Sequence, residues 1–154
     1  NLLCIVFLLY TIISMKKVVA KALLFDNSNH ILLLYRGLTH PYFPNHPDFP
    51  GGEVEKNEDW FVAVCREIEE ETGILTTPHQ IYCLFQKEYS NVIHVLYKVK
   101  LKTSAQTVPI KLSWEHRDYK WITRRKLCQI TPPDADRYYL DVIEYLCAST
   151  PELP

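Results

Sequence analysis

Residues 51–74 read GGEVEKNEDWFVAVCREIEEETGI, and this stretch decides the fold. Its first part predicts a loop and its second part a helix. Asn57 is the expected N-cap, acidic residues follow in the first turn, and apolar residues recur at helical spacing from Phe61 to Ile68. Gly73 is the natural C-terminal stop, because glycine adopts the left-handed conformation that ends many helices.

Three glutamates share one face of the predicted helix. Each residue advances by about 100°, so Glu67, Glu70 and Glu71, at spacings of three and four, are neighbours. Like charges at this spacing destabilise a helix, and a hard cation such as Mg²⁺ would compensate them, with water and substrate phosphates as its other ligands. Arg66 flanks this face, and its fixed charge can keep the carboxylates ionised. The face therefore predicts a metal–phosphate site, whereas Glu69 points away.

A glycine pair, Gly51 and Gly52, precedes the helix. Glycine permits positive φ angles and lets the backbone approach a ligand closely, so a carbonyl here could complete the shell of a metal. Each feature also has an ordinary explanation, because glycine pairs are usually turns and glutamate runs on helices are usually solvated. Neither feature alone indicates a site.

The two features together resemble the Nudix box. That box is a glycine, five residues, a glutamate, seven residues, Arg-Glu, an aliphatic residue, any residue, Glu-Glu, any residue, a glycine and an aliphatic residue. Since each fixed residue type makes up about 5–7% of average composition, a chance match at a given start is below about 10⁻⁸. Every position is filled here, by Gly52, Glu58, Arg66, Glu67, Ile68, Glu70, Glu71, Gly73 and Ile74.

The resemblance extends over residues 15–127, because strand-like sequence flanks the box on both sides. It implies the α/β fold class, as an α/β/α sandwich around a mixed β-sheet in which the box forms a loop–helix–loop. It further implies bound Mg²⁺ or Mn²⁺ and hydrolysis of a nucleoside diphosphate linked to another moiety.

Individual roles follow from the resemblance residue by residue. Metal binding falls to the Glu67, Glu70 and Glu71 carboxylates and the Gly51 carbonyl, and substrate binding falls to Gly51 and Gly52. Arg66 is the expected organiser of the carboxylates. The base that takes a proton from the attacking water varies within the family. We favour Glu67, and Glu115 is the candidate outside the box, although an ordinary exposed acid would look the same.

The remaining elements are predicted from periodicity and from turn or breaker residues. Four prolines between His40 and Pro50 predict a long exposed loop. The other predicted elements are a β-hairpin of residues 18–25 and 31–35, a second hairpin of residues 80–89 and 92–101, a strand over residues 119–123 and a helix over residues 134–147.

Bulk properties indicate a globular protein with a single domain over residues 15–154. Residues 1–14 form an apolar leader that is too short to span a membrane and lacks the features of a secretory signal. Because Met15 is the only methionine, we expect translation to begin there and the leader not to be native; a real leader would anchor the protein to a membrane.

The net charge bears on the binding partners of the protein, and the cysteine content bears on its cellular location. The net charge is −1 and the basic residues are scattered, which argues against a nucleic-acid duplex and favours a small nucleotide substrate. The five cysteines lack paired metal-ligand spacing, so we expect reduced thiols in a cytoplasmic protein. Cys65 falls on the apolar stripe as a core residue.

Several histidines and aromatic residues give weaker indications of a functional site. Of the histidines, His40, His46, His94 and His116 show no metal-ligand spacing and are not expected in a site. Trp114, Tyr42 and Phe43 could stack on a base, although aromatic residues more often pack.

The favoured function is a nucleoside triphosphate pyrophosphatase of the MutT kind, because the chain is minimal, acting as a monomer or homodimer. ADP-ribose and dinucleoside polyphosphate hydrolases stay open as alternatives. The first often has a proline about fifteen residues past the box, where this chain has Tyr89-Ser90, and the second often varies the Pro-Gly-Gly entry. A non-catalytic nucleotide sensor is the alternative from another class, but its eroded box is not seen here.

Overall fold

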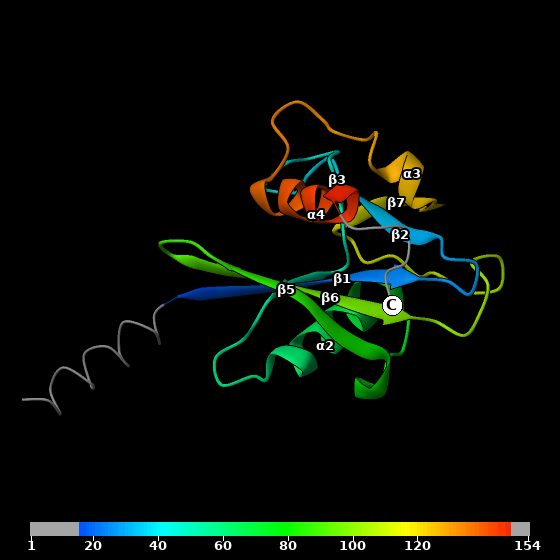
Figure 1. The fold of residues 1–154 in the computed structure, drawn as a ribbon, viewed down its shortest axis with the longest axis horizontal. Helices are drawn as coiled ribbons and strands as arrows, with labels where there is room; N and C mark the ends of the chain where they lie inside the picture. Colours follow the sequence, from blue (N-terminus) through cyan, green and yellow to red (C-terminus); the bar gives the residue numbers. More distant parts are fainter. Residues whose placement is uncertain (1–15, 149–154) are drawn as a thin grey trace, which may run out of the picture.

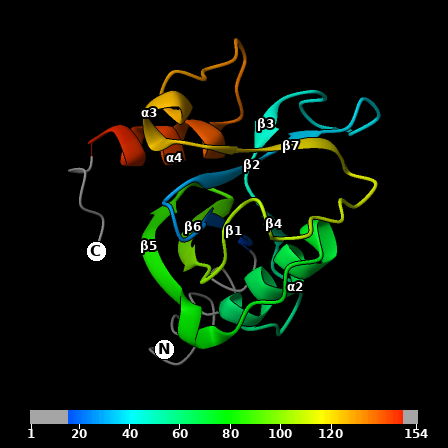
Figure 2. The ribbon, with the colours of Figure 1, turned by 90° about the vertical axis from the view of Figure 1, so that its right-hand side faces the viewer.

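A computed structural model describes residues 16–148 and shows a mixed seven-stranded β-sheet with helices on both faces (Figures 1 and 2). The strand order is β3-β2-β1-β6-β5, with β4 also on β1 and β7 on β2. The elements are β1 (Lys17–Phe25), β2 (Ile31–Arg36), β3 (Pro47–Asp48), β4 (Gly51–Glu53), α2 (Trp60–Thr72), the 3₁₀ helix η1 (Pro78–Gln80), β5 (Ile81–Glu88), β6 (Val92–Lys100), β7 (His116–Ile122), α3 (Arg124–Leu127) and α4 (Arg137–Ala148).

Strand β1 is the centre of the sheet. It runs parallel to β6 over nine residue pairs, and on its other edge it pairs antiparallel with β4. Its last six residues are all buried, as is typical of a strand covered on both faces. The predicted hairpin of residues 18–35 is confirmed only at its turn, where Phe25 pairs with Ile31. Beyond that turn the strands diverge, because β2 pairs with β7 instead.

Successive residues of β1 face opposite sides, and a helix covers each side. Ala20, Ala22 and Leu24 pack with Val64 and Ile68 of α2. The alternate residues, such as Leu23, pack with α3 and α4 through buried groups that include Leu127, Tyr138, Val142 and Leu146. The predicted α/β/α sandwich around a mixed sheet is therefore confirmed (Figure 1).

Helix α2 begins later than predicted. Asp59, with extended φ and ψ angles, is the N-cap, and its side chain accepts a hydrogen bond from the Phe61 N–H. The prediction of Asn57 as the N-cap is wrong, because Asn57 adopts a positive φ of 66° inside a tight turn. The prediction of acidic residues in the first helical turn is also wrong, since that turn contains none. Gly73 is confirmed as the C-terminal stop, with a φ of 72°. Helix α4 likewise begins at Arg137 rather than residue 134.

The expectation of a long exposed loop over residues 40–50 is wrong for its second half. Residues 41–45 are exposed, but residues 47–50 are buried, and β3 pairs with β2 here. Phe49 is fully buried and its ring stacks on Tyr139 of α4, with ring centroids 5.4 Å apart. This segment therefore packs in the core before the chain enters the glycine pair.

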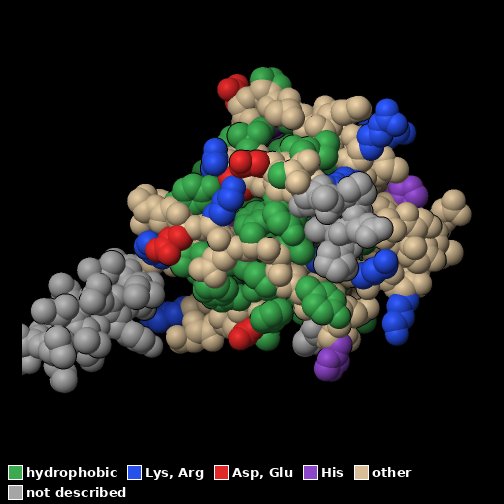
Figure 3. All heavy atoms as spheres, viewed as in Figure 1, with side chains coloured by type: hydrophobic (Ala, Val, Ile, Leu, Met, Phe, Trp, Pro, Cys, Tyr) green, Lys and Arg blue, Asp and Glu red, His purple; other side chains and the backbone are tan. Residues whose placement is uncertain are grey.

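The other predicted elements are confirmed, with β5 and β6 as the second hairpin and β7 longer than expected. On the described part of the face shown in Figure 3, lysines and arginines are scattered among acidic and apolar side chains without a continuous basic stripe. Within residues 16–148, no helix is long and apolar enough to cross a membrane. The leader of residues 1–14 lies outside the described residues.

The expectation that all cysteines are reduced is wrong for one pair. Cys128, after α3, and Cys147, in α4, form a disulfide across a separation of 19 residues. Strand order and helix packing bring them together, which spacing alone could not show. Cys65 is a free cysteine packed against the α2 side of the core, as expected. The cytoplasmic location stays a prediction.

Candidate active site

The glycine pair lets two helix carboxylates lie directly against the backbone of β4. The Gly51 N–H donates a hydrogen bond to Glu71 Oε2 at 2.8 Å. Gly51 has a φ of 132°, and a Cβ there would lie only 2.3 Å from the Ala20 carbonyl oxygen of β1. A Cβ on Gly52 would lie 2.8 Å from the carboxyl group of Glu67. Gly51 therefore requires glycine because of its φ and its backbone contacts, whereas a side chain at position 52 would displace the Glu67 carboxylate.

Arg66 holds the carboxylates on the outer side of this face. Its Nε and Nη2 donate to the two oxygens of Glu58 at 2.8 and 2.9 Å. Its Nη1 donates to Glu67 Oε1 at 2.8 Å and to Glu70 Oε2 at 3.3 Å. The hydrogen bond from Arg66 lowers the pKa of Glu58, and the same bond raises the pKa of Arg66 further above its ordinary value. Arg66 thus stays charged and fixes three of the acids.

The inner carboxylates lie in a dehydrated environment. Burial raises the pKa of Glu67, although Arg66 opposes this shift. Burial also raises the pKa of Glu71 well above its usual range, and the nearby Lys21 opposes that shift. Glu70, by contrast, has a side chain that is 58% exposed. Burial and mutual repulsion of the inner acids are what a bound cation would relieve.

The donor set fits a hard divalent cation in its chemistry. The side chains of Glu67, Glu70 and Glu71 offer only oxygen atoms as ligands, which a hard cation prefers. The Glu67 carboxylate occupies the space that a Cβ on Gly52 would need. Among residues 16–148 no three acidic, histidine or cysteine side chains already converge as a metal-holding group. The exposed Glu70 has the freedom to turn from Arg66 toward the ion, while Glu67 and Glu71 stay held by Arg66 and by the Gly51 N–H.

A loop from the far end of the sheet brings Glu115 to the same place. The Lys111 and Ser113 N–H groups donate to the Thr72 and Glu71 carbonyl oxygens at 2.8 and 3.1 Å, which satisfies the C-terminal end of α2. Glu115 follows this docked segment, and its charge contributes to the raised pKa of Glu67 after the larger effect of burial. Glu115, the candidate base outside the box, is therefore close enough to interact electrostatically with Glu67.

A cavity of about 560 Å³ opens beside these residues. Gly51, Gly52, Glu71 and Glu115 line it, whereas Glu67, Glu70 and Arg66 are not among its lining residues. The aromatic side chains of Tyr42, Phe43 and Trp114 also line it, and Tyr42 and Trp114 are 70% and 76% exposed.

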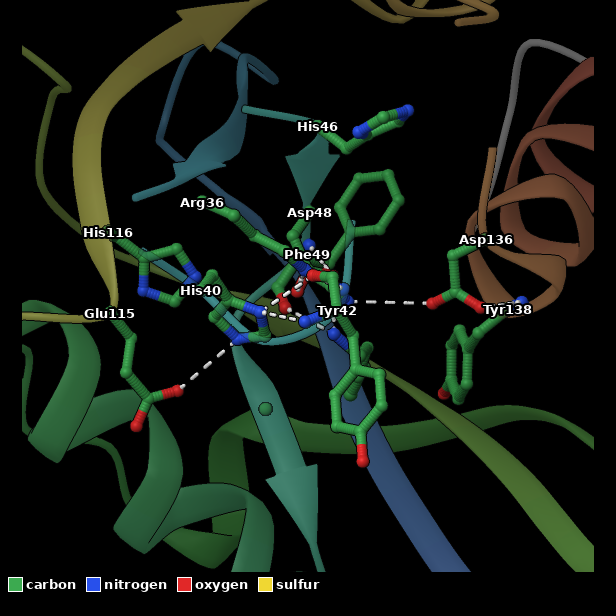
Figure 4. Close-up of polar contacts among 12 residues, drawn as sticks. Arg36, His40, Tyr42, His46, Asp48, Phe49, Glu115, His116, Asp136 and Tyr138 are labelled. Atoms are coloured by element: carbon green, nitrogen blue, oxygen red, sulfur yellow. Dashed lines mark hydrogen bonds and ion pairs between the residues drawn. The ribbon is translucent and has the colours of Figure 1, made fainter. Parts of the chain in front are cut away.

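Buried charges form one side of the cavity (Figure 4). Asp48 of β3 accepts a hydrogen bond from Arg36 Nε at 2.9 Å and is ion-paired with Lys21 of β1. Arg36 also reaches Asp136, before α4, with 3.5 Å between Nη2 and Oδ2. Burial by itself raises the pKa of Asp48, but Lys21 and Arg36 outweigh it and bring the pKa down to about 2. This side of the cavity is therefore charged and rigidly paired.

Three histidines that the sequence does not place in a site line the cavity, namely His40, His94 of β6 and His116. His116 is buried, its Nδ1 lies 3.9 Å from Glu71 Oε1, and burial lowers its pKa to about 4. His40 faces Glu115, with 3.9 Å between Nε2 and Oε2. The positions of His40 and His116 depend on the pairing of β2 with β7, and no local sequence signal marks that pairing.

Comparisons with known proteins show which family and fold the chain resembles. A family model described as "NUDIX domain" matches residues 15–144. The 8-oxo-dGTP diphosphatase of Escherichia coli K12 is 37% identical over 73 residues, which cover 47% of this chain and 54% of that protein. The mouse asymmetrical bis(5'-nucleosyl)-tetraphosphatase is 32% identical over 85 residues, covering 53% and 58%. The chain thus spans a little over half the length of these relatives.

A solved structure is similar over most of the fold. The MutT protein from Methanosarcina mazei Go1 superposes with a TM-score of 0.68 at 27% identity, covering 84% of this chain and 91% of that one.

Proposed function

The chain belongs to the NUDIX domain family, and from this premise we propose that it hydrolyses a phosphoric anhydride bond in a nucleotide substrate with the help of Mg²⁺ or Mn²⁺. The single observation that carries the proposal is the contact between Glu67 and Gly52. The box carboxylate, held by Arg66, lies where any side chain at position 52 would be, at the edge of the cavity. The named activities of the two relatives support the same class of reaction.

The residues of the box have different roles in the proposed reaction. Glu67, Glu70 and Glu71 and the Gly51 carbonyl would hold the ion, which when bound neutralises the diphosphate and lowers the pKa of the attacking water. Arg66 stays protonated and orients Glu67 through a hydrogen bond of 2.8 Å. Glu67 is our first candidate for the base that accepts the proton of that water, and Glu115 is the second. Gly51 and Gly52 line the cavity, so their backbone would border the substrate.

For the substrate, we favour a nucleoside triphosphate, cut in the manner of a pyrophosphatase of the MutT kind. The cavity has a volume suited to a small molecule, with aromatic side chains at Tyr42 and Trp114 and polar groups on its walls. A planar base can stack on such side chains. The E. coli relative, named for 8-oxo-dGTP, supports this choice.

A dinucleoside polyphosphate is the second candidate, and a specific observation favours it. A further cavity of about 780 Å³ lies next to the first, and the two share Lys17 and Glu53 as lining residues. These residues form an ion pair with 2.6 Å between Nζ and Oε2, and their side chains are more than half exposed. Two adjoining cavities could take the two halves of a longer substrate.

The deciding experiment is release of phosphate or pyrophosphate from nucleoside triphosphates, oxidised nucleotides, ADP-ribose and dinucleoside polyphosphates, with and without Mg²⁺. Glu70→Gln is the test variant. Glu69→Gln is the matched control, because Glu69 is an exposed neighbour outside the carboxylate face. We expect turnover that needs Mg²⁺, falls about 100-fold or more in Glu70→Gln and is retained in Glu69→Gln.

Absence of turnover on every compound, with nucleotide binding retained, would instead support the sensor alternative. A metal-binding measurement separates the two steps. Mg²⁺ at about 100 times its Kd should stabilise the wild type by about 2.7 kcal/mol, seen as a rise in melting temperature, and Glu70→Gln should lose most of this rise.

A further inference from the structure

His40 and Glu115 face each other at the wall of the cavity (Figure 4). The His40 Nε2 lies 3.9 Å from Glu115 Oε2, and the two side chains are 15% and 40% exposed. This is an ion-pair distance rather than a hydrogen bond, and such contacts often tighten when a substrate binds. We call these two residues the His40–Glu115 pair.

The backbone brings the two residues together from distant parts of the chain. Arg36, at the end of β2, pairs with His116 at the start of β7, so the segments after β2 and before β7 emerge side by side. The Gly37 N–H donates to the Glu115 carbonyl oxygen at 2.7 Å, and the His40 N–H donates to the Gly37 carbonyl oxygen at 3.3 Å. The separation of the pair is therefore set by main-chain hydrogen bonds.

The imidazole ring is also held in one orientation. Its Nδ1 lies 2.6 Å from the Tyr42 carbonyl oxygen, so that nitrogen is occupied within its own loop. With Nδ1 donating to that carbonyl, Nε2 carries a hydrogen for Glu115 only in the doubly protonated imidazolium form, so the ion pair requires a charged His40. The Tyr42 carbonyl in turn accepts a hydrogen bond from Arg36 Nη1 at 2.9 Å, which ties the loop to the buried charges of β2 and β3.

Glu115 differs from the other acids of the site in how it is held. Glu67 is fixed by Arg66, and Glu71 by the Gly51 N–H. Among the residues that the structure describes, His40 is the only basic side chain shown within ion-pair distance of the Glu115 carboxylate. A half-exposed glutamate without a partner would sample several rotamers, whereas a base must point at the water it deprotonates.

We propose that His40 is a positioning residue that holds the Glu115 carboxylate toward the box, so that Glu115 takes part in the chemical step. The proposal rests on the proposed hydrolase function. Among the described residues, no contact is shown between His40 and a box carboxylate, so His40 would act through Glu115.

A double-mutant cycle tests this dependence. His40→Ala should lower kcat about tenfold with KM changed less than about twofold, because positioning affects the chemical step more than binding. In the Glu115→Gln background, His40→Ala should change kcat less than about twofold, since its target is already lost. His40→Gln, whose amide can donate from a similar place, should recover part of the loss. Independent, multiplying effects of the two substitutions would overturn the proposal.

A control variant and a replacement variant keep the test of kcat specific. Thr39→Ala changes an exposed neighbour in the same loop and should leave kcat unaltered. If His40→Ala does not fold, His40→Gln replaces it in the cycle, and an undiminished effect of His40→Gln in the Glu115→Gln background would again refute the dependence.

An activity-independent measurement separates this proposal from the proposed function. In ¹⁵N-labelled protein, the His40 Nε2 resonance should move on Glu115→Gln and stay in place on Glu53→Gln, a cavity acid that pairs with Lys17 instead. An unmoved resonance in Glu115→Gln would overturn the pair even in an active enzyme. A wild type inactive on every nucleotide, with the resonance shift present, would refute the hydrolase function and not the contact.

Discussion

Gly51 and Gly52 are adjacent, yet an added methyl group would meet different atoms at each. At Gly51 it would meet the backbone of β1, including the Ala20 oxygen at 2.3 Å, and the φ of 132° excludes other residues. At Gly52 it would meet only the end of the Glu67 side chain, which can rotate away. At the scale of single residues, one glycine maintains the fold and the other leaves room for a carboxylate.

The first prediction follows from this difference. Gly52→Ala should keep its melting temperature within a few degrees but lose about 100-fold in Mg²⁺-dependent turnover, because Glu67 is displaced. Gly51→Ala should instead destabilise the fold by several kcal/mol, since backbone atoms cannot give way. Thermal unfolding and kinetics on the same two variants check this. Equal stability losses in both would contradict the distinction.

Arg66 gives the second prediction. Its planar guanidinium contacts Glu58 with two nitrogens and Glu67 with a third, a pattern that one ammonium group cannot reproduce. Arg66→Lys should therefore keep the charge yet lower kcat about tenfold or more, because Glu67 loses its fixed orientation. Steady-state kinetics of Arg66→Lys beside the control Glu69→Gln measure this. A kcat equal to the wild type would show that charge alone is sufficient.

At the scale of elements, the start of α2 depends on the turn that precedes it. Glu55 and Glu58 close that turn, with the Glu55 N–H donating to Glu58 Oε2 at 2.9 Å. The turn places Asn57 in the left-handed region and leaves Asp59 as the first residue with N-cap geometry. The same turn delivers Glu58 to Arg66, so the helix start and the site share one piece of local structure.

The third prediction concerns this cap. Asp59→Ala should lower the free energy of unfolding by about 1 kcal/mol, because the Phe61 N–H loses its acceptor. Asn57→Gly should change stability by less than about 0.5 kcal/mol, because glycine tolerates a positive φ. Urea denaturation of both variants provides the measurement. A larger loss in Asn57→Gly than in Asp59→Ala would restore Asn57 as the cap.

At the scale of the whole molecule, buried charges join elements that are distant in the sequence. Lys21 of β1, Arg36 of β2 and Asp48 of β3 form one buried cluster, and Arg36 continues it to Asp136 at the start of α4. Because a buried charge that loses its partner is costly, the cluster penalises any arrangement that separates these elements. It also fixes the charged side of the cavity.

The fourth prediction is a dependence of stability on pH. The folded-state pKa of Asp48, about 2, lies below its ordinary value of 3.8, so the unfolded state binds more protons between these values. The contribution of Asp48 is therefore fully present above about pH 4 and is lost as the pH falls toward 2, by about 2 kcal/mol. Chemical denaturation from pH 5 to pH 2 measures the slope.

Asp48→Asn separates this contribution from that of the other acids. The variant should be less stable by about 3–5 kcal/mol at neutral pH, because it leaves two cations buried without their partner. Its stability should also fall less than that of the wild type between pH 4 and pH 2. Parallel pH profiles for the two proteins would show that Asp48 is not the responsible group.

The sequence by itself determined the box, the helix that carries it and the α/β fold class. The box and its helix are local features: Glu67, Glu70 and Glu71 share a face because of helical spacing, and Gly73 ends the helix through its own conformation. The fold class is instead implied by the resemblance of the box to a known family. The roles of the box residues in catalysis and metal binding stay predictions.

Only the tertiary structure decided which residues outside the box meet it. Asp48, His40 and His116 reach the cavity because β2 pairs with both β3 and β7, and Cys128 meets Cys147 because α3 and α4 share one face of the sheet. The N-cap at Asp59 also depends on the turn closed by Glu55 and Glu58. Pairing between distant strands leaves no fixed spacing in the chain, because the contact is made in space and the connecting segments can vary in length.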